Sequence, residues 1–157
     1  MQRHAFLKTM AAAALASLTL SMPAAAAEAK ATKREAEALV AKAVAYLKAN
    51  GPDKAYAEFT NGAAFKDREL YVIVYDLNGK NLAHGANAKL VGKDLIGMKD
   101  PDGKLLNKML VDLAKEKGKG WSDEFKFRNP VTNDLQRRTV YVERVGETFV
   151  GAGVFLD

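Results

Sequence analysis

The stretch LYVIVYDLNGKNLAHG, residues 70–85, carries the strand-turn-strand pattern that decides the fold. Residues 70–76 are mostly β-branched or aromatic, which favours a strand over a helix. Asn78-Gly79 then supplies the positive φ that a tight hairpin turn needs, and a second strand should run from Asn81 to Gly85. The sequence therefore predicts a β-hairpin near the middle of the chain.

Two helices are expected before this hairpin. Thr32 and Glu35 form a capping-box pattern, and apolar residues then recur at helical spacing over residues 36–47. Pro52 begins a second, shorter helix, since proline is well tolerated in the first helical turn. The long first helix is amphipathic and should pack along a sheet.

One helix and three strands are expected after the hairpin. Residues 105–113 place leucines and a methionine on one helical face, and Gly118 is a stop signal. Strands should follow at residues 122–129, 135–145 and 148–156, joined by short turns. The predicted fold class is α+β: a five-stranded antiparallel sheet with a long N-terminal helix and further helices packed on it.

The first 27 residues have the pattern of a secretory signal peptide. Arg3 and Lys8 precede an apolar run of small residues that is too short for a comfortable membrane span, and an alanine-rich exit leads to a cut near Ala27. An uncleaved anchor is the alternative. Residues 28–157 are expected to form one domain, located in the periplasm and not spanning the membrane after cleavage.

Composition excludes several classes of function. The chain has no cysteine, which rules out disulfides, thiolate nucleophiles and thiolate metal sites. Its formal net charge is only +5, and charges of both signs alternate along the predicted helices, so we expect a solvated surface and no nucleic-acid partner.

Four runs carry a resemblance to a known family. They are DLNGKNLAHGANAKLVGKDLIGMKDPDGK, GKGWSDEFKFRNP, RTVYVERV and FVGAGVF. In this order and spacing they resemble the single Cache domain in its second subtype (sCache_2), over roughly residues 33–157. The resemblance implies a PAS-like extracytoplasmic sensor fold with a pocket on the sheet for small molecules such as short organic acids. Since the chain stops directly after the last predicted strand, we expect a free-standing periplasmic binding protein.

His84 is the only histidine after the predicted signal peptide, and its isolation argues against reaction chemistry. A zinc site needs three or four ligands, and no second histidine and no cysteine is present to join it. Ser122 lacks the strained-turn motif of a nucleophile. We therefore expect no catalytic residue, no metal and no cofactor.

Two cationic or polar residues are the first candidates for ligand binding. Arg138 offers a planar fork of donors that matches a carboxylate, although Arg137 and Arg138 point to opposite faces and periodicity alone does not say which one is inward. The resemblance favours Arg138 as the inward residue and puts His84 at a pocket position. A structural role for His84 is the alternative.

Four aromatic residues complete the candidate site. Trp121 and Phe125 are spaced to lie on one face of the third predicted strand, and Tyr75 and Tyr141 offer hydroxyl groups. Core packing is the alternative for each. Residues 87–104 should form a loop that covers the pocket, and Gly151 and Gly153 open one strand face to a helix or a ligand.

We therefore expect a domain that binds a small metabolite, a short organic acid or another anion, without catalysis. The alternative is an interaction module that docks on a membrane sensor kinase, chemoreceptor or transporter and carries little ligand itself.

Overall fold

The structure, a computed structural model, describes residues 29–156, and the predicted signal peptide lies outside the described residues. Its elements follow the chain in this order: α1 (Lys33–Asn50), α2 (Pro52–Asn61), β1 (Lys66–Asp67), β2 (Leu70–Asp76), β3 (Asn81–His84), the short 3-10 helix η1 (Ala88–Leu90), α3 (Leu106–Lys117), β4 (Lys119–Trp121), β5 (Phe125–Arg128), β6 (Leu135–Val145) and β7 (Thr148–Leu156). Both helices predicted before the hairpin, the hairpin itself and the later helix are confirmed.

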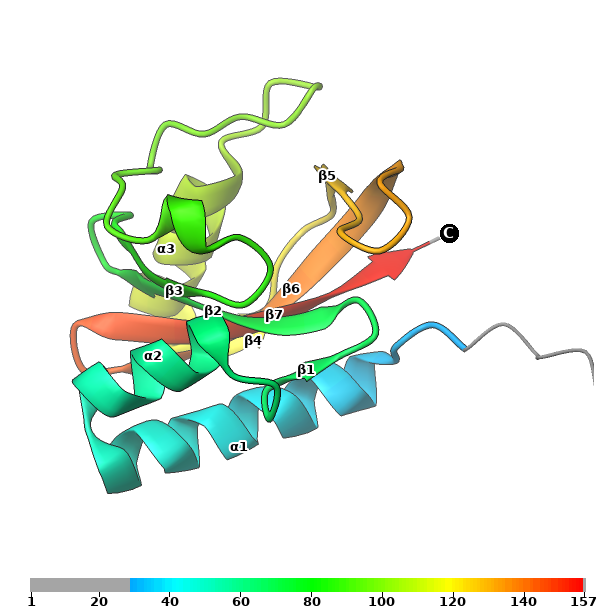
Figure 1. Ribbon diagram of the computed structural model, residues 1–157. Coiled ribbons are helices and arrows are strands. Elements are labelled where there is room, and N and C mark those ends of the chain that lie inside the picture. Colours follow the sequence, from blue (N-terminus) through cyan, green and yellow to red (C-terminus); the bar gives the residue numbers. More distant parts are fainter. Residues whose placement is uncertain (1–28, 157) are drawn as a thin grey trace, which may run out of the picture.

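One antiparallel sheet forms the middle layer of the molecule (Figure 1). Its central strands lie in the order β2–β7–β6. On one side, β1 and β3 pair with the two ends of β2; on the other, β4 and β5 pair with different parts of β6. The α+β class is confirmed. The sheet has seven strands where the sequence predicted five, because β1 is added and a separate strand, β4, precedes the strand expected at residues 122–129, which is β5.

A bulge separates β4 from β5. Trp121 pairs with Tyr141, and Phe125 pairs with Arg138, so four steps on one strand correspond to three on the other. Ser122 fills the break, because its N–H donates to the Val140 carbonyl at 2.8 Å and its hydroxyl accepts from the Val140 N–H at 3.0 Å. One extra residue reverses the faces beyond it. Trp121 and Phe125 therefore lie on opposite faces of the sheet.

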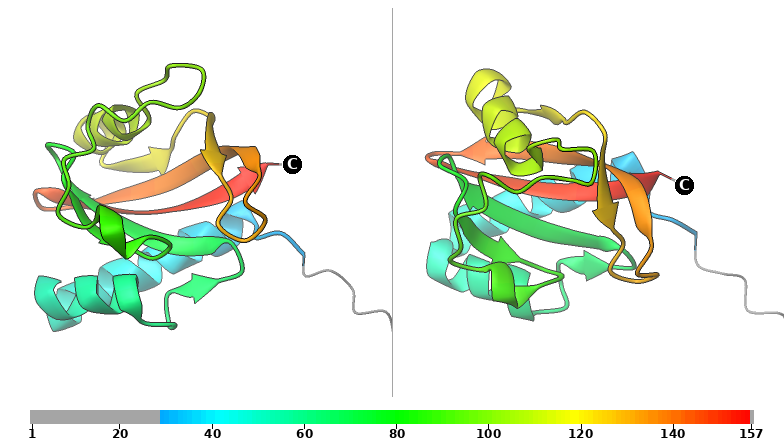
Figure 2. Two further views of the ribbon diagram at one scale, coloured as in Figure 1. Left: turned by 45° about the horizontal axis from the view of Figure 1, so that its top comes forward. Right: turned by 90° about the horizontal axis from the view of Figure 1, so that it is seen from above.

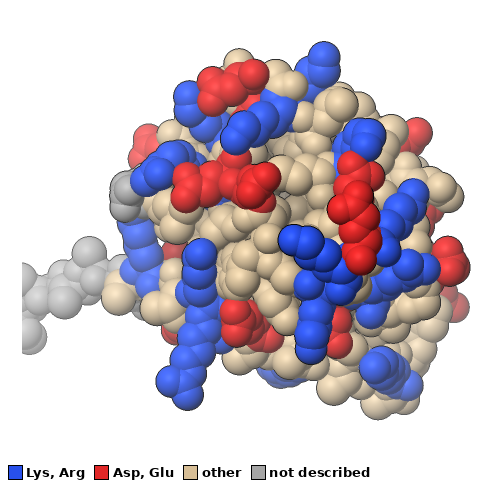
Figure 3. Space-filling model, turned by 180° about the vertical axis from the view of Figure 1, so that it is seen from behind, with Lys and Arg blue, Asp and Glu red and all other residues tan. Residues whose placement is uncertain are grey.

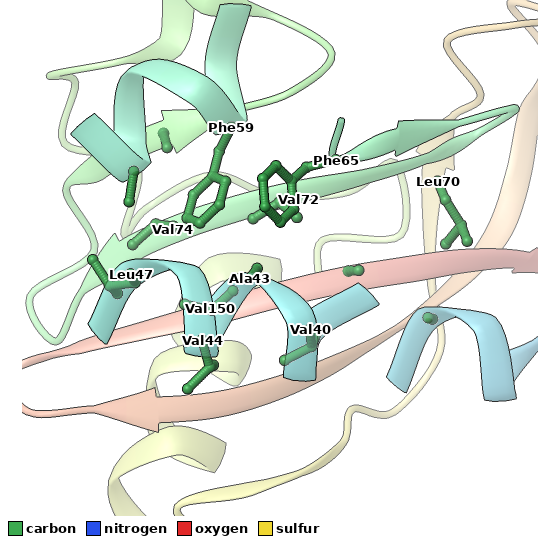
Figure 4. Packing of buried hydrophobic residues seen from close by; sticks show 14 of the residues in the cluster. Val40, Ala43, Val44, Leu47, Phe59, Phe65, Leu70, Val72, Val74 and Val150 are labelled. Atoms are coloured by element: carbon green, nitrogen blue, oxygen red, sulfur yellow. The ribbon is translucent and has the colours of Figure 1, made fainter. Parts of the chain in front are cut away.

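The first face of the sheet packs against α1 and α2. Figure 4 shows side chains from both helices, among them Val40, Leu47 and Phe59, pointing toward Val72, Val74 and Val150 on the strands. The Thr32–Glu35 capping box that starts α1 is present, with the Thr32 N–H donating to the Glu35 carboxylate at 2.6 Å. This layer is apolar and closely packed.

The second face is covered by α3 and by the loop of residues 85–105 (Figure 2). Buried residues from α3, including Leu106 and Leu110, meet Ile73, Tyr75 and Val140 from the strands. The candidate site residues on β2, β3, β5 and β6 belong to this second layer. Charged side chains of both signs lie interspersed on the outer surface seen from behind in Figure 3.

Candidate functional site

A small cavity lies between the sheet and the layer formed by α3 and the covering loop. Four of the six side chains proposed from the sequence line it: Tyr75, His84, Phe125 and Arg138. The remaining lining residues are Ile73, Leu90, Met98, Leu106, Asn107, Leu110, Phe127 and Val140. The cavity volume is about 20 Å³, counted as room for the centres of water molecules, which corresponds to about one water.

Arg138 is the charged group of this cavity, and its side chain is almost completely buried. Its Nη1 donates to the Tyr71 hydroxyl at 2.7 Å, whereas Nε and Nη2 find no hydrogen-bond partner among residues 29–156. The guanidinium carbon lies 4.7 Å from the centroid of the Tyr71 ring and 5.2 Å from those of Phe127 and Phe155. These aromatic faces offset part of the cost of burying the charge.

No acidic side chain of the described chain neutralises Arg138, since none of the ion pairs within residues 29–156 includes it. Burying an unpaired charge costs several kcal/mol. A buried guanidinium with two donor groups that no residue of 29–156 accepts from is suited to a small anion, because charge-assisted hydrogen bonds are stronger in a buried site than in bulk water.

His84 is held as a neutral imidazole with a defined tautomer. Its Nδ1 accepts hydrogen bonds from the backbone N–H groups of Ala86 at 3.2 Å and Asn87 at 3.0 Å, so the ring proton resides on Nε2. Burial, together with the positive charge of Arg138, lowers the pKa of His84 to about 4. At neutral pH the ring is therefore an uncharged donor.

Two further polar groups meet the cavity from β2 and α3. Burial raises the pKa of Tyr75 to about 12, so its hydroxyl keeps its proton at neutral pH. Asn107 lies on the buried face of α3, and its side-chain N–H donates to the Leu95 carbonyl at 2.9 Å. Both groups restrict the shape and polarity of the space in front of Arg138.

Trp121 and Tyr141 lie elsewhere. Their rings are 5.5 Å apart and pack against the layer of α1, on the face of the sheet that does not hold Arg138. The Trp121 indole N–H donates to the Glu37 carboxylate at 2.7 Å. The interpretation that Trp121 shares a face with Phe125 is wrong because of the bulge, and Tyr141 is three residues from Arg138, which on a strand means the opposite face.

Tyr71 and Asn107 are residues of the site that sequence reasoning missed. Tyr71 lies four residues before Tyr75 on the same strand, so the period of two places it on the same face. Asn107 precedes Leu110 by three residues and Val111 by four, which puts a polar side chain on the apolar face of a helix. Both signals were present in the sequence.

A second hollow of about 250 Å³ adjoins the cavity on its outer side. It lies between residues 86–90 and the β5–β6 hairpin, and it shares His84, Leu90 and Phe127 with the inner cavity. Tyr71 also lines it, so the hydroxyl that holds Arg138 belongs to a ring that faces the outer hollow. The outer hollow is therefore separated from the cavity of Arg138 by side chains that line both, among them His84 and Leu90.

The far end of the covering loop is tied to β5 by a buried carboxylate. Asp100 accepts from the N–H groups of Asp102 and Lys104 with one oxygen, and from the Lys126 N–H at 3.0 Å with the other. The hydrogen bond from the Lys126 amide is the largest of the effects that lower the pKa of Asp100. Backbone N–H groups of the turn at residues 100–104 therefore donate to the Asp100 carboxylate.

Within residues 29–156, no group of three histidine, aspartate or glutamate side chains is arranged to hold a metal ion. Likewise, none of the helices within that range is long and apolar enough to cross a membrane.

Known proteins resemble this chain in sequence. It is 29% identical over 93 residues to the methyl-accepting chemotaxis protein McpP of Pseudomonas putida, a match that covers 58% of this chain and 17% of the relative. It is also 29% identical over 93 residues to the sensor histidine kinase MctS of Rhizobium johnstonii, covering 57% of this chain and 20% of the relative. The chain thus spans about a fifth or less of the length of these curated relatives.

Solved structures share the fold. A methyl-accepting chemotaxis protein from Vibrio parahaemolyticus superposes with a TM-score of 0.68 at 24% identity, covering 80% of this chain and 88% of the other. The periplasmic sensor domain of a chemotaxis protein gives 0.62 at 25% identity, covering 79% and 90%. A Cache chemosensory domain studied for carboxylic acid recognition gives 0.62 at 24% identity, covering 79% and 88%.

The family profile of Single Cache domain 2 (sCache_2) matches residues 1–157. With the fold and the profile in agreement, the chain belongs to the Single Cache domain 2 family.

Proposed function

We propose that this chain binds a small carboxylate in the cavity beside Arg138 and serves as a ligand-sensing domain without catalytic activity. The observation that carries the proposal is the buried guanidinium whose Nε and Nη2 have no partner in the described chain. The carboxylic acid recognition of the structurally similar Cache chemosensory domain supports the same ligand class.

In the proposed complex, Arg138 supplies the positive charge and His84 supplies a neutral Nε2–H donor. The cavity is small and its apolar lining includes Leu106 and Leu110 from α3 and Val140 from β6, so the favoured ligand has a short apolar tail. A ligand larger than a water molecule requires the side chains of the covering layer to move apart, and Leu90 lies at the boundary with the outer hollow.

The experiment is calorimetric titration of the domain with propionate and with its neutral isostere propionamide. We expect propionate to bind and propionamide to bind at least about tenfold more weakly, because a charge-assisted bond is lost. Arg138→Met should reduce propionate affinity by about tenfold or more. Arg137→Ala, which changes the neighbouring exposed arginine of the Glu124 ion pair, is the matched control and should bind as the native chain does.

Equal affinity for propionate and propionamide, or native affinity after Arg138→Met, would overturn the proposal. If no short acid binds at all, the alternative of a docking module on a membrane sensor or transporter becomes the better hypothesis, to be tested by capture of a membrane protein.

We further propose a periplasmic location, with residues 1–27 removed on export. The supporting observations are the signal-peptide pattern of the sequence and the likeness to a periplasmic sensor domain. The N-terminal sequence of protein recovered from the periplasmic fraction tests this: a mature chain beginning near Glu28 is expected, and an intact Met1 would contradict it.

A further inference from the structure

Gly153 lies on β7 directly beneath the guanidinium of Arg138. β7 runs beside β6, and Arg138 pairs with Phe155 while Gly153 pairs with Val140. A Cβ atom built on Gly153 would lie 2.5 Å from Nε and 2.9 Å from Nη2 of Arg138, and 2.9 Å from the Thr139 carbonyl oxygen. Real Cβ atoms do not approach other atoms so closely, so the guanidinium occupies the space that any side chain at position 153 would need.

The guanidinium has little freedom to move away from that position. Tyr71 holds Nη1 at 2.7 Å, and the rings of Tyr71, Phe127 and Phe155 surround the guanidinium carbon. The open direction is the cavity, which has room for about one water molecule. A displaced guanidinium would therefore fill the space that the ligand uses.

We propose that Gly153 is a positioning residue for ligand binding: the lack of a side chain there seats Arg138 against the β7 backbone and keeps the cavity open. This inference rests on the proposed function, because it assigns to Gly153 the placement of the group that binds the anion. The glycine does not contact the ligand, and it acts through Arg138 alone.

Gly151 provides the matched control. It lies two residues earlier on the same face of β7, and a Cβ there would lie 3.2 Å from a Val140 methyl, 3.3 Å from an Ile73 side-chain carbon and 3.3 Å from the Tyr141 carbonyl oxygen. Small shifts of two aliphatic side chains can accommodate most of this crowding. Gly151→Ala therefore adds the same methyl group to the same strand without touching Arg138.

The test compares Gly153→Ala and Gly151→Ala by calorimetric titration with propionate and by thermal unfolding. We expect Gly153→Ala to weaken propionate binding by about tenfold or more, and Gly151→Ala to keep affinity within about twofold. Propionate binding by Gly153→Ala at native affinity, with Arg138→Met still defective, would overturn this inference and leave the proposed function intact. Loss of the Arg138 dependence itself would instead remove the proposed function.

A double-mutant cycle on stability covers the case in which Gly153→Ala folds poorly. Gly153→Ala should lower the melting temperature clearly in the native background and much less in the Arg138→Ala background, because the Nε and Nη2 contacts are then absent. An equal decrease in both backgrounds would assign the crowding to the Thr139 carbonyl and would overturn the role of Gly153 in seating Arg138.

Discussion

The two faces of the sheet differ in what they bury. The face toward α1 and α2 buries aliphatic and aromatic side chains, with Phe59 and Phe65 in edge contact at 4.7 Å between ring centroids. The face toward α3 buries Arg138, His84 and Asn107 among its apolar residues. One face contributes stability through dense packing, whereas the other buries polar groups, among them an unpaired cation, at a cost in stability.

The sharpest way to examine this contrast is to remove a large side chain from the α1 face. Phe59→Ala should lower the free energy of unfolding by about 3–5 kcal/mol, because a fully buried ring is replaced by a cavity. Urea titration measures the change. The propionate affinity of the folded protein should stay native. A decrease in the free energy of unfolding of less than about 1 kcal/mol would show that Phe59 is not densely packed.

Acid should destabilise the α3 face through His84. Above pH 6.5 the imidazole of His84 is neutral in both the folded and the unfolded chain. Below pH 6.5 the imidazole becomes protonated in the unfolded chain, whereas in the folded chain, where its pKa is about 4, it stays neutral. Stability should therefore decrease as the pH falls from 6.5 to 4, by on the order of 3 kcal/mol. Urea unfolding across this range measures it.

His84→Asn isolates that effect, since the asparagine Oδ1 lies where Nδ1 does and can still accept the amide bonds but does not titrate. Between pH 6.5 and 4.5, the free energy of unfolding of this variant should depend less on pH than that of the native chain. The pKa values of Glu35 and Asp100 are held below their usual range, mainly by hydrogen bonds from the backbone N–H groups of Thr32 and Lys126, respectively. Protonation of these two carboxylates therefore also lowers the stability of the fold, at lower pH. An unchanged pH dependence of stability in His84→Asn would mean that another group is responsible.

Removal of the buried charge should leave stability unchanged or raise it. Arg138→Met keeps an apolar side chain of comparable length and removes an unpaired cation, so the free energy of unfolding should stay level or increase by on the order of 1 kcal/mol. Thermal and urea unfolding check this. A loss as large as that of Phe59→Ala would mean that the guanidinium is a structural group.

The smallest effect is expected at Trp121. Trp121→Phe removes the hydrogen bond to Glu37 at the surface of α1, which should cost less than about 1 kcal/mol and leave propionate affinity unchanged. Thermal unfolding and calorimetric titration measure both quantities. A clear loss of affinity would show that the two faces are coupled through β6.

Periodicity and capping signals account for most of the fold. The β-branched run at residues 70–76 and the Thr32–Glu35 pair were sufficient for β2 and the start of α1, because each depends on neighbours within a few residues. The bulge after Trp121 depends on the hydroxyl of Ser122 pairing with Val140 eighteen residues away, and no local pattern announces it.

The candidate site was predictable where one strand determines it. His84 and Tyr75 follow from the hairpin, but the choice between Arg137 and Arg138 required the pairing partners of β6, and the resemblance supplied the inward residue before the structure did. Gly153 was recognised as an open position, yet its neighbour is a side chain from another strand and not a helix.

The two amide bonds to Nδ1 make His84 an intrinsic spectroscopic reporter. The chain contains only two histidines, and this one has a fixed tautomer in a buried ring whose centroid lies 5.1 Å from that of Tyr71. Its imidazole resonances should therefore be sharp, shifted by the neighbouring ring and easily assigned in a nuclear magnetic resonance spectrum. Occupancy of the cavity can then be followed on one ring, without any label added to a protein that has no cysteine to carry one.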